Sequence, residues 1–205
     1  LADDTTMKDE TRRIFYVNHP ELNDKASFNG HCRTTEQSIV LGCYIENKGI
    51  FLLDVKDPRL NGVMEVTAAH EALHAIYDRL SSDERTKVDK MTSDFFATIK
   101  DERIKSTIEN YRSKDAKVVP NELHSILGTE VKDLSPELEK YYSKYFSSRK
   151  KIADYSQQYE NTFVELREQV EEIDSELDSL KKQIDNNQTE LNGLSQNLDS
   201  ARQNL

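Results

Sequence analysis

The sequence predicts an α+β fold, in which a small domain of a β-hairpin and several helices precedes one long C-terminal helix. Two runs rich in β-branched and aromatic residues flank a short turn before residue 56. A mostly apolar helical segment carries two closely spaced histidines, and a seven-residue apolar repeat runs through the C-terminal part. The composition agrees, because a long polar helix explains a hydrophobic fraction of 36% beside 32% charged residues.

The charge and hydropathy of the chain narrow the classes of partner. The net charge is −10 over 205 residues, without a dense run of Lys and Arg, so we expect neither nucleic acid nor an anionic membrane surface as partner. No stretch approaches the ~20 apolar residues that cross a bilayer, so we expect no membrane span in this chain. The chain begins at Leu1 without an initiator methionine, which favours a processed N-terminus.

The N-terminal segment contains one predicted strand. Residues 1–12 are polar and lack periodicity, so we expect a flexible lead-in to a domain that spans residues 13–146. Residues 13–17 are rich in β-forming side chains and end shortly before Pro20, which predicts a strand there.

A β-hairpin is predicted next. Residues 38–45 and 49–55 are β-prone and flank a turn in which Asn47 and Gly49 supply the backbone freedom. An exposed strand edge can pair with an extended peptide. The order of elements therefore favours a peptide or protein substrate.

The two cysteines predict a redox compartment. Cys32 and Cys43 are 11 positions apart, and an even count at short separation predicts a disulfide and an extracytoplasmic, secreted or surface-anchored protein. The alternative is two buried free thiols. Neither cysteine has the C-x-x-C spacing of a zinc site, so cysteine ligation is disfavoured.

The most informative element is a helix predicted from Asn61-Gly62 to about Leu80. It contains a His-Glu-x-x-His motif, His70, Glu71 and His74. In a helix, both imidazoles lie on one face and can bind the same metal ion, whereas Glu71 points about 100° away and can contact a water there. The alternative is a core helix with two hydrogen-bonded histidines.

Further helices are predicted after the motif. Ser81 or Ser82 caps one, and an apolar repeat of three and four continues to Tyr111, which predicts amphipathic packing across the motif helix. Pro120 suits the first turn of a short helix that Gly128 ends.

That short helix supplies the third ligand which a zinc site requires. Glu122 is our assignment, because a carboxylate on a separate helix can approach the motif helix. His124 and Glu130 are alternatives. Glu122 and His124 do not both ligate, since residues two apart point to nearly opposite sides of a helix.

The motif helix followed by a later helix opening Asn121-Glu122 resembles the gluzincin group of zincin metallopeptidases, whose best-known member is thermolysin. The resemblance covers about residues 38–130. It implies Zn²⁺ bound by His70, His74 and Glu122, with Glu71 as the catalytic base. The family often has an aspartate four positions after the ligand glutamate, where this chain has Ile126.

The family's transition-state histidine or tyrosine has no firm counterpart here, and His124 and Tyr111 are the candidates. Metzincins are disfavoured, because no glycine and third histidine follow His74 at their short spacing.

Residues 147–205 predict a coiled-coil segment. Two interleaved seven-residue series run through residues 159–205, which favours self-association or a partner helix. Asn187 interrupts one series and can fix register, and Glu176 and Lys181 occupy g and e positions that pair in a parallel dimer. The alternatives are a single helix that folds back on the domain and an antiparallel pair. The apolar series is Phe163, Val170, Leu177, Ile184, Leu191, Leu198 and Leu205, and the other is Tyr159, Leu166, Ile173, Leu180, Asn187, Leu194 and Ala201.

These features predict a zinc-dependent metallopeptidase, an endopeptidase with Glu71 as general base. A second hypothesis is a catalytically inactive zincin-like module for adhesion or interaction, whose coiled coil mediates assembly. A third is a structural coiled-coil protein in which the histidine motif is accidental.

Overall fold

The computed structural model describes residues 1–32 and 41–204 and shows a mixed α+β fold, which confirms the predicted class. The described residues form eight α-helices, one short 3₁₀ helix and one three-stranded sheet. The chain divides into two compact units, Leu1–Glu160 and Asn161–Leu205. The first unit carries every element described below except the greater part of α8.

The sheet confirms the predicted hairpin over its described part. Strand β2 (Gly42–Ile45) pairs antiparallel with β3 (Gly49–Leu53), and β1 (Glu21–Asn23) adds to β3 in parallel, giving the order β1-β3-β2. The turn uses left-handed backbone at Asn47, with φ of 61°. Residues 38–40 of the predicted hairpin lie outside the described residues.

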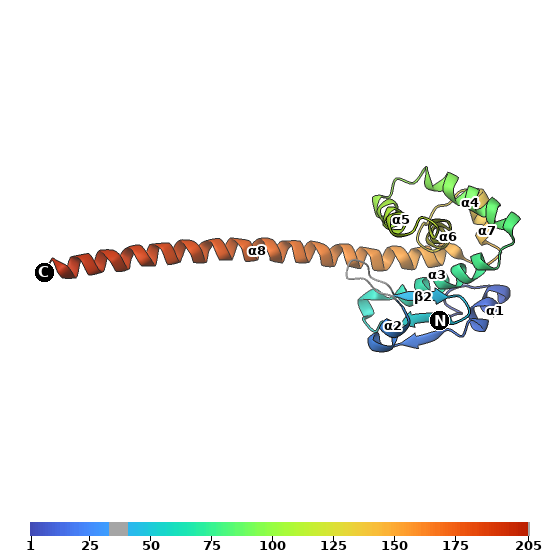
Figure 1. The fold of residues 1–205 in the computed structure, drawn as a ribbon, viewed down its shortest axis with the longest axis horizontal. Coiled ribbons are helices and arrows are strands. Elements are labelled where there is room, and N and C mark those ends of the chain that lie inside the picture. Colours follow the sequence, from blue (N-terminus) through green and yellow to red (C-terminus); the bar gives the residue numbers. More distant parts are fainter. Residues whose placement is uncertain (33–40, 205) are drawn as a thin grey trace. The chain divides into compact units, whose positions relative to one another are not determined.

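Helix α3 (Val63–Asp78) is the central element of the first unit. It begins after Gly62, whose φ of 90° suits a residue without a Cβ. The sheet packs against α3, and so does α6 (Val119–Thr129); Figure 1 shows these two elements on opposite sides of α3. Helix α3 carries the His-Glu-x-x-His motif, so both layers adjoin the motif.

Four helices, α4 to α7, form one layer of the first unit, with α6 against α3. They are α4 (Ser82–Phe96), α5 (Glu102–Lys114), α6 and α7 (Pro136–Tyr142). The predicted cap of α4 is present as a capping box between Ser81 and Glu84. The apolar face of α5 packs on α6, so this amphipathic segment reaches the motif helix through α6.

The strand predicted at residues 13–17 is wrong, because this segment belongs to helix α1 (Asp9–Val17). Asp9 and Glu10 suit a helix N-terminus, and Thr11 and Phe15, four residues apart, bury one helical face. Packing of that face outweighs the β-propensity of the sequence.

The first residues also differ from the expected flexible lead-in. Ala2, Thr5 and Met7 are buried, and Met7 forms a β-bridge with Phe146. The backbone N–H of Ser147 donates to the carbonyl of Thr6 at 2.8 Å. The segment therefore packs against the start of the long helix.

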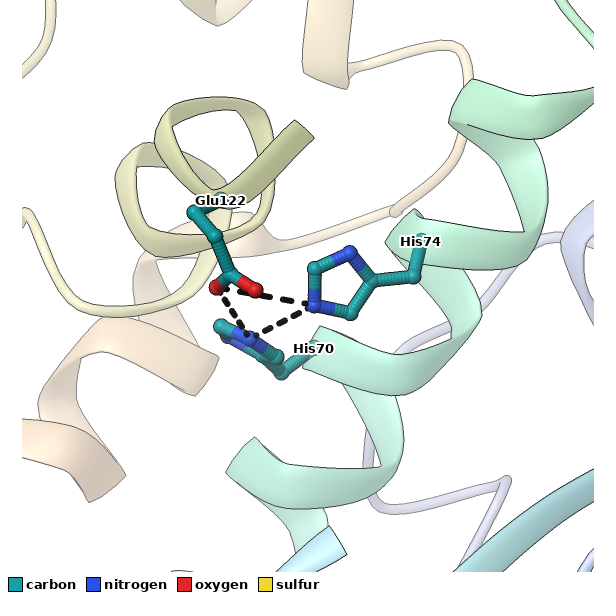
Figure 2. A group of neighbouring side chains, drawn as sticks. All are labelled: His70, His74 and Glu122. Carbon is teal, nitrogen blue, oxygen red and sulfur yellow. Dashed lines mark hydrogen bonds and ion pairs between the residues drawn. The ribbon is translucent and has the colours of Figure 1, made fainter. Parts of the chain in front are cut away.

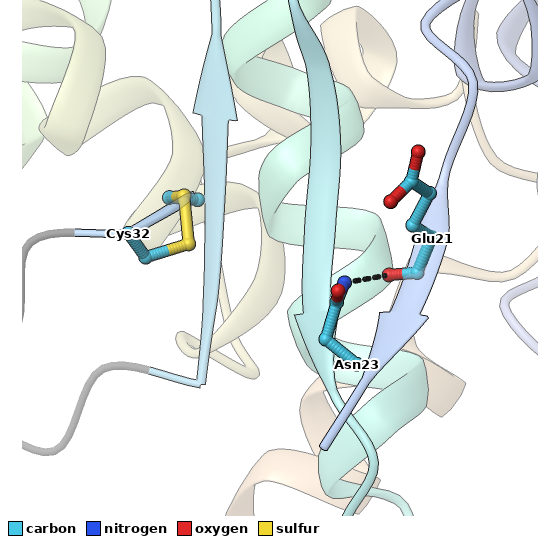
Figure 3. The surroundings of a disulfide bond; sticks show 4 residues. Glu21, Asn23 and Cys32 are labelled. Atoms are coloured by element: carbon cyan, nitrogen blue, oxygen red, sulfur yellow. Dashed lines mark hydrogen bonds between the residues drawn. A yellow bond between two sulfur atoms is a disulfide. The ribbon is translucent and has the colours of Figure 1, made fainter. Parts of the chain in front are cut away.

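The predicted disulfide between Cys32 and Cys43 is confirmed. It joins Cys32, which follows α2 (Lys25–His31), to strand β2. Figure 3 shows the disulfide at Cys32 beside this strand. The bridge lies in a small apolar cluster with Phe28 and Phe51. It therefore ties α2 to a strand that contacts the motif helix.

The long helix α8 (Arg149–Gln203) contributes to both units. Its first residues are buried in the first unit, and buried Arg149 pairs with Glu139 and donates to two backbone carbonyls. This unit therefore extends to Glu160, beyond the boundary expected at residue 147. Among residues 1–32 and 41–204, no helix is both long and apolar enough to cross a membrane.

We expect Gly128→Ala to lower the free energy of unfolding by about 1–3 kcal/mol, because the new methyl group enters a packed interface. A Cβ at this position of α6 would meet Leu73 of α3 and lie 2.9 Å from Cε1 of Tyr142. Urea unfolding measures the loss. The matched control is Gly30→Ala in α2, where nothing lies within 4 Å and stability should stay level or rise. Equal effects of the two changes would contradict the packing described here.

Candidate metal centre

Two histidines of α3 and one glutamate of α6 meet in the first unit. His70 and His74 are one helical turn apart, and Glu122 reaches them from the facing helix, as Figure 2 shows. The two Nε2 atoms are 3.1 Å apart, and Oε2 of Glu122 is 3.8 Å from that of His70 and 3.7 Å from that of His74. The structure thus brings together three potential ligands that are 52 positions apart at most in sequence.

The geometry of this cluster fits one metal ion. Ligands about 2.0–2.1 Å from a tetrahedral zinc ion are separated from one another by about 3.3 Å, close to the three observed distances. Oε2 of Glu122 is also buried without a hydrogen-bond partner among the described residues. A buried carboxylate oxygen that lacks a partner needs a cation or a donor. The three residues could therefore bind a metal ion.

The electrostatics of the cluster favour a cation as well. Burial raises the pKa of Glu122, but the neighbouring His70, the charge of His74 and the Tyr111 hydroxyl together outweigh burial and hold this pKa below its usual value. Burial lowers the pKa of His70, but Glu122 and the charges of nearby acids raise it by more than burial lowers it. The resulting pKa is about 9. A metal ion entering the site therefore competes with a proton on His70.

Asn121 orients one of the histidines. Its Oδ1 lies 2.9 Å from Nδ1 of His74, and an amide oxygen can only accept, so Nδ1 is the donor. The lone pair of His74 is then on Nε2, which is the atom that faces Glu122 and His70. The two residues of the Asn121-Glu122 pair thus have different roles. Glu122 is a potential ligand, and Asn121 sets the tautomer of a second potential ligand, His74.

Glu71 lies on the side of α3 that faces strand β2. It is only 5% exposed, and a backbone hydrogen bond from Tyr44 reaches its carboxylate. Burial raises the pKa of Glu71, and the charges of His74 and His70 offset only part of that rise. A carboxylate held this way takes up a proton more readily than an exposed one.

Gly42 explains how β2 comes so close. A Cβ at Gly42 would lie 2.9 Å from Oε1 of Glu71 and 2.5 Å from Cγ2 of Thr67. Only glycine therefore allows the strand to contact this part of α3 without displacing the carboxylate. No local pattern indicates this role, because the contact joins a strand and a helix that are far apart along the chain.

The remaining predicted site residues lie in three different surroundings. Tyr111 of α5 interacts with Glu122, and this contact contributes to the shifted pKa of both groups. His124 is fully buried on α6, where its ring contacts Tyr77 of α3 and its Nε2 lies 2.9 Å from the Tyr141 hydroxyl. Burial, with the charges of His74 and His70, lowers the pKa of His124 to about 3. Glu130 forms an ion pair with Arg103 at 2.7 Å.

We expect Glu122→Gln to weaken Zn²⁺ binding by more than the ~10–100-fold that a change outside the ligand set costs, because the cation loses a charged ligand. Competition with a chromophoric chelator measures the affinity. The matched control is Glu130→Gln, which removes a nearby carboxylate that pairs with Arg103. If the Glu130 variant loses zinc and the Glu122 variant binds it fully, the third ligand is Glu130 and our assignment of Glu122 is wrong.

We expect Asn121→Ala to reduce zinc affinity about 10–100-fold while keeping a stoichiometry of one, because His74 loses the acceptor that fixes its tautomer. The same chelator competition measures the change, and elemental analysis gives the stoichiometry. Unchanged affinity in this variant would show that the hydrogen bond does not orient the ligand.

Neither a scan against protein-family models nor searches of curated proteins and solved structures found a match to this chain. The candidate metal centre therefore stands on the chain's own residues. It consists of two histidines of α3 and one glutamate of α6, an asparagine that orients one histidine, and a buried glutamate on the adjoining face of α3.

Proposed function

We propose that this chain is a zinc-dependent metallopeptidase that hydrolyses peptide bonds, with a domain of the gluzincin type. One observation carries the proposal: a buried glutamate lies beside the cluster of three potential ligands. This glutamate is Glu71, and it is on the same helix as His70 and His74. The cluster supplies three potential ligands, which is the number of protein ligands in a hydrolytic zinc site.

The donor set favours zinc among the common metals. Two imidazoles and one carboxylate suit Zn²⁺, whereas Mg²⁺ and Ca²⁺ prefer oxygen ligands. Zn²⁺ in such a site polarises a carbonyl oxygen and lowers the pKa of a water ligand to about 7.

Glu71 is the proposed general base. As water attacks the carbonyl carbon of the substrate, the Glu71 carboxylate accepts the proton that the water loses. It then donates this proton to the amine nitrogen as the C–N bond breaks, which regenerates the carboxylate. The raised pKa of Glu71 supports this role, because a base must hold the proton between the two steps.

Strand β2 is the proposed binding element for the substrate. It pairs with β3 alone among the described strands, and its backbone at Tyr44 bonds to Glu71. An extended peptide that runs beside this strand would pass next to the proposed base. The substrate class is therefore a peptide or an unfolded segment of a protein.

The disulfide supports an extracytoplasmic location for this activity, because such bonds persist in oxidising compartments. The alternative function is an inactive zincin-like module that serves in adhesion or assembly. The exposed apolar side chains of α8 favour that alternative, since they suit a role in assembly.

We expect Glu71→Gln to retain zinc but lose about 10²–10⁴-fold in the rate of peptide hydrolysis, since the amide cannot accept the proton. The assay follows cleavage of a reduced, unfolded protein with and without a chelator. Glu65→Gln is the matched control, because Glu65 lies on the same helix and is not a member of the cluster.

Chelator-sensitive cleavage by the wild-type chain and the Glu65 variant, lost in the Glu71 variant, supports the proposal. Equal rates for the Glu71 variant and the wild type would reject Glu71 as the base. A zinc-loaded wild-type chain that cleaves no unfolded protein would favour the inactive module.

A further inference from the structure

The second unit exposes a long apolar stripe on α8. Eight large apolar side chains between residues 170 and 198 are 47–66% exposed. They recur at intervals of three and four residues, except that Asn187 takes the place between Ile184 and Leu191, so they lie on one side of the helix. Monomeric soluble proteins rarely expose so many contiguous apolar side chains. The stripe consists of Val170, Ile173, Leu177, Leu180, Ile184, Leu191, Leu194 and Leu198.

We propose that a second copy of this chain covers the stripe and forms a parallel, in-register two-stranded coiled coil over residues 170–201. This inference does not depend on the proposed hydrolysis. It rests on the one polar residue within the stripe and on the charges that flank it.

Asn187 determines the orientation. In heptad notation the stripe has an a series, with Val170 first, and a d series that contains Asn187. An antiparallel pair places each d residue against an a residue of the other helix, and every a residue from 170 to 198 is apolar. Asn187 would then face an apolar side chain in every antiparallel register. A buried amide without a partner is costly, so this orientation is disfavoured.

Asn187 also determines the register. A parallel pair places d against d, and the neighbouring d residues are Leu180 and Leu194. Only the unshifted register brings the two Asn187 amides together, where each can donate to and accept from the other. A shift by one heptad would leave both amides against leucine.

The flanking charges favour the same arrangement. Glu176 is a g residue and Lys181 is the following e residue, so each glutamate meets the lysine of the second copy in the parallel, in-register pair. Within one helix Lys181 contacts Asp178 at 3.3 Å, and both side chains are more than 60% exposed. Such an exposed pair is weak, so it does not prevent Lys181 from pairing across the interface.

The first experiment tests whether the stripe is the interface. Sedimentation equilibrium of the full chain should show a dimer, and Leu180→Lys should make it monomeric at the same concentration. The matched control is Ser179→Lys, which places the same charge one residue away on the outer face of α8 and should leave the dimer intact. Each variant is checked by the urea unfolding of its first unit, because residues 1–160 are unchanged.

A monomeric wild-type chain at ~100 µM would overturn the proposal, and so would equal effects of the two lysine substitutions. A monomer that dimerises only with a different helical protein belongs to this outcome.

The second experiment tests orientation by charge reversal. In the parallel dimer, Glu176→Lys should raise the dissociation constant roughly tenfold at low salt, since two attractive pairs become repulsive. The double variant Glu176→Lys with Lys181→Glu should restore binding.

In an antiparallel dimer, g residues meet g residues, and none of the g residues from 169 to 197 is basic. Reversing Glu176 then removes no attraction. Unchanged or tighter association of the Glu176 variant would therefore overturn the parallel arrangement.

Discussion

The burial of two carboxylates beside two imidazoles is the constraint on which the first unit depends. Glu71 and the Oε2 atom of Glu122 are buried, and an isolated ionised carboxylate is costly in the interior of a protein. His70 and His74 offset this cost by placing two ring nitrogens within 4 Å of Glu122. Helix α3 must therefore face α6 closely enough for the three side chains to meet.

Small residues make that close packing possible on both faces of α3. Ala68, Ala69, Ala72 and Ala75 are fully buried, so no long side chain separates the helix from its neighbours. Gly128 performs the same function on α6, where the helix rests against Leu73 and Tyr142. Gly42 does so on β2 next to Glu71. Alanines and glycines that take no part in the chemistry of the site therefore set the distance between α3 and the elements packed against it.

Local pattern was enough to predict the elements that carry the site, because helices and hairpins leave signals in adjacent residues. The motif helix, the Glu122 helix, the hairpin and the disulfide follow from spacing, capping and turn residues. The strand predicted at residues 13–17 is wrong for a physical reason. The buried side chain of Phe15 stabilises helix α1 by packing against residues that are distant in sequence, and this outweighs the β-propensity of the segment. Helix geometry separates Glu122 from His124, but only tertiary packing shows that Glu122 reaches the two histidines while His124 meets Tyr141. The contact of Gly42 with Glu71 depends on the same packing and has no local signal.

The two units carry separate physical tasks. All residues of the candidate metal centre lie between Gly42 and Glu122, within the first unit, so the second unit contributes none of them. The proposed association through α8 therefore adds no ligand from the second unit, and its expected effect is to hold two sites at a high effective concentration relative to each other. If the proposed hydrolysis holds, such an arrangement raises the apparent affinity for a substrate with several cleavable segments. A monomeric variant should thus keep the rate on a short peptide and lose activity mainly on long chains.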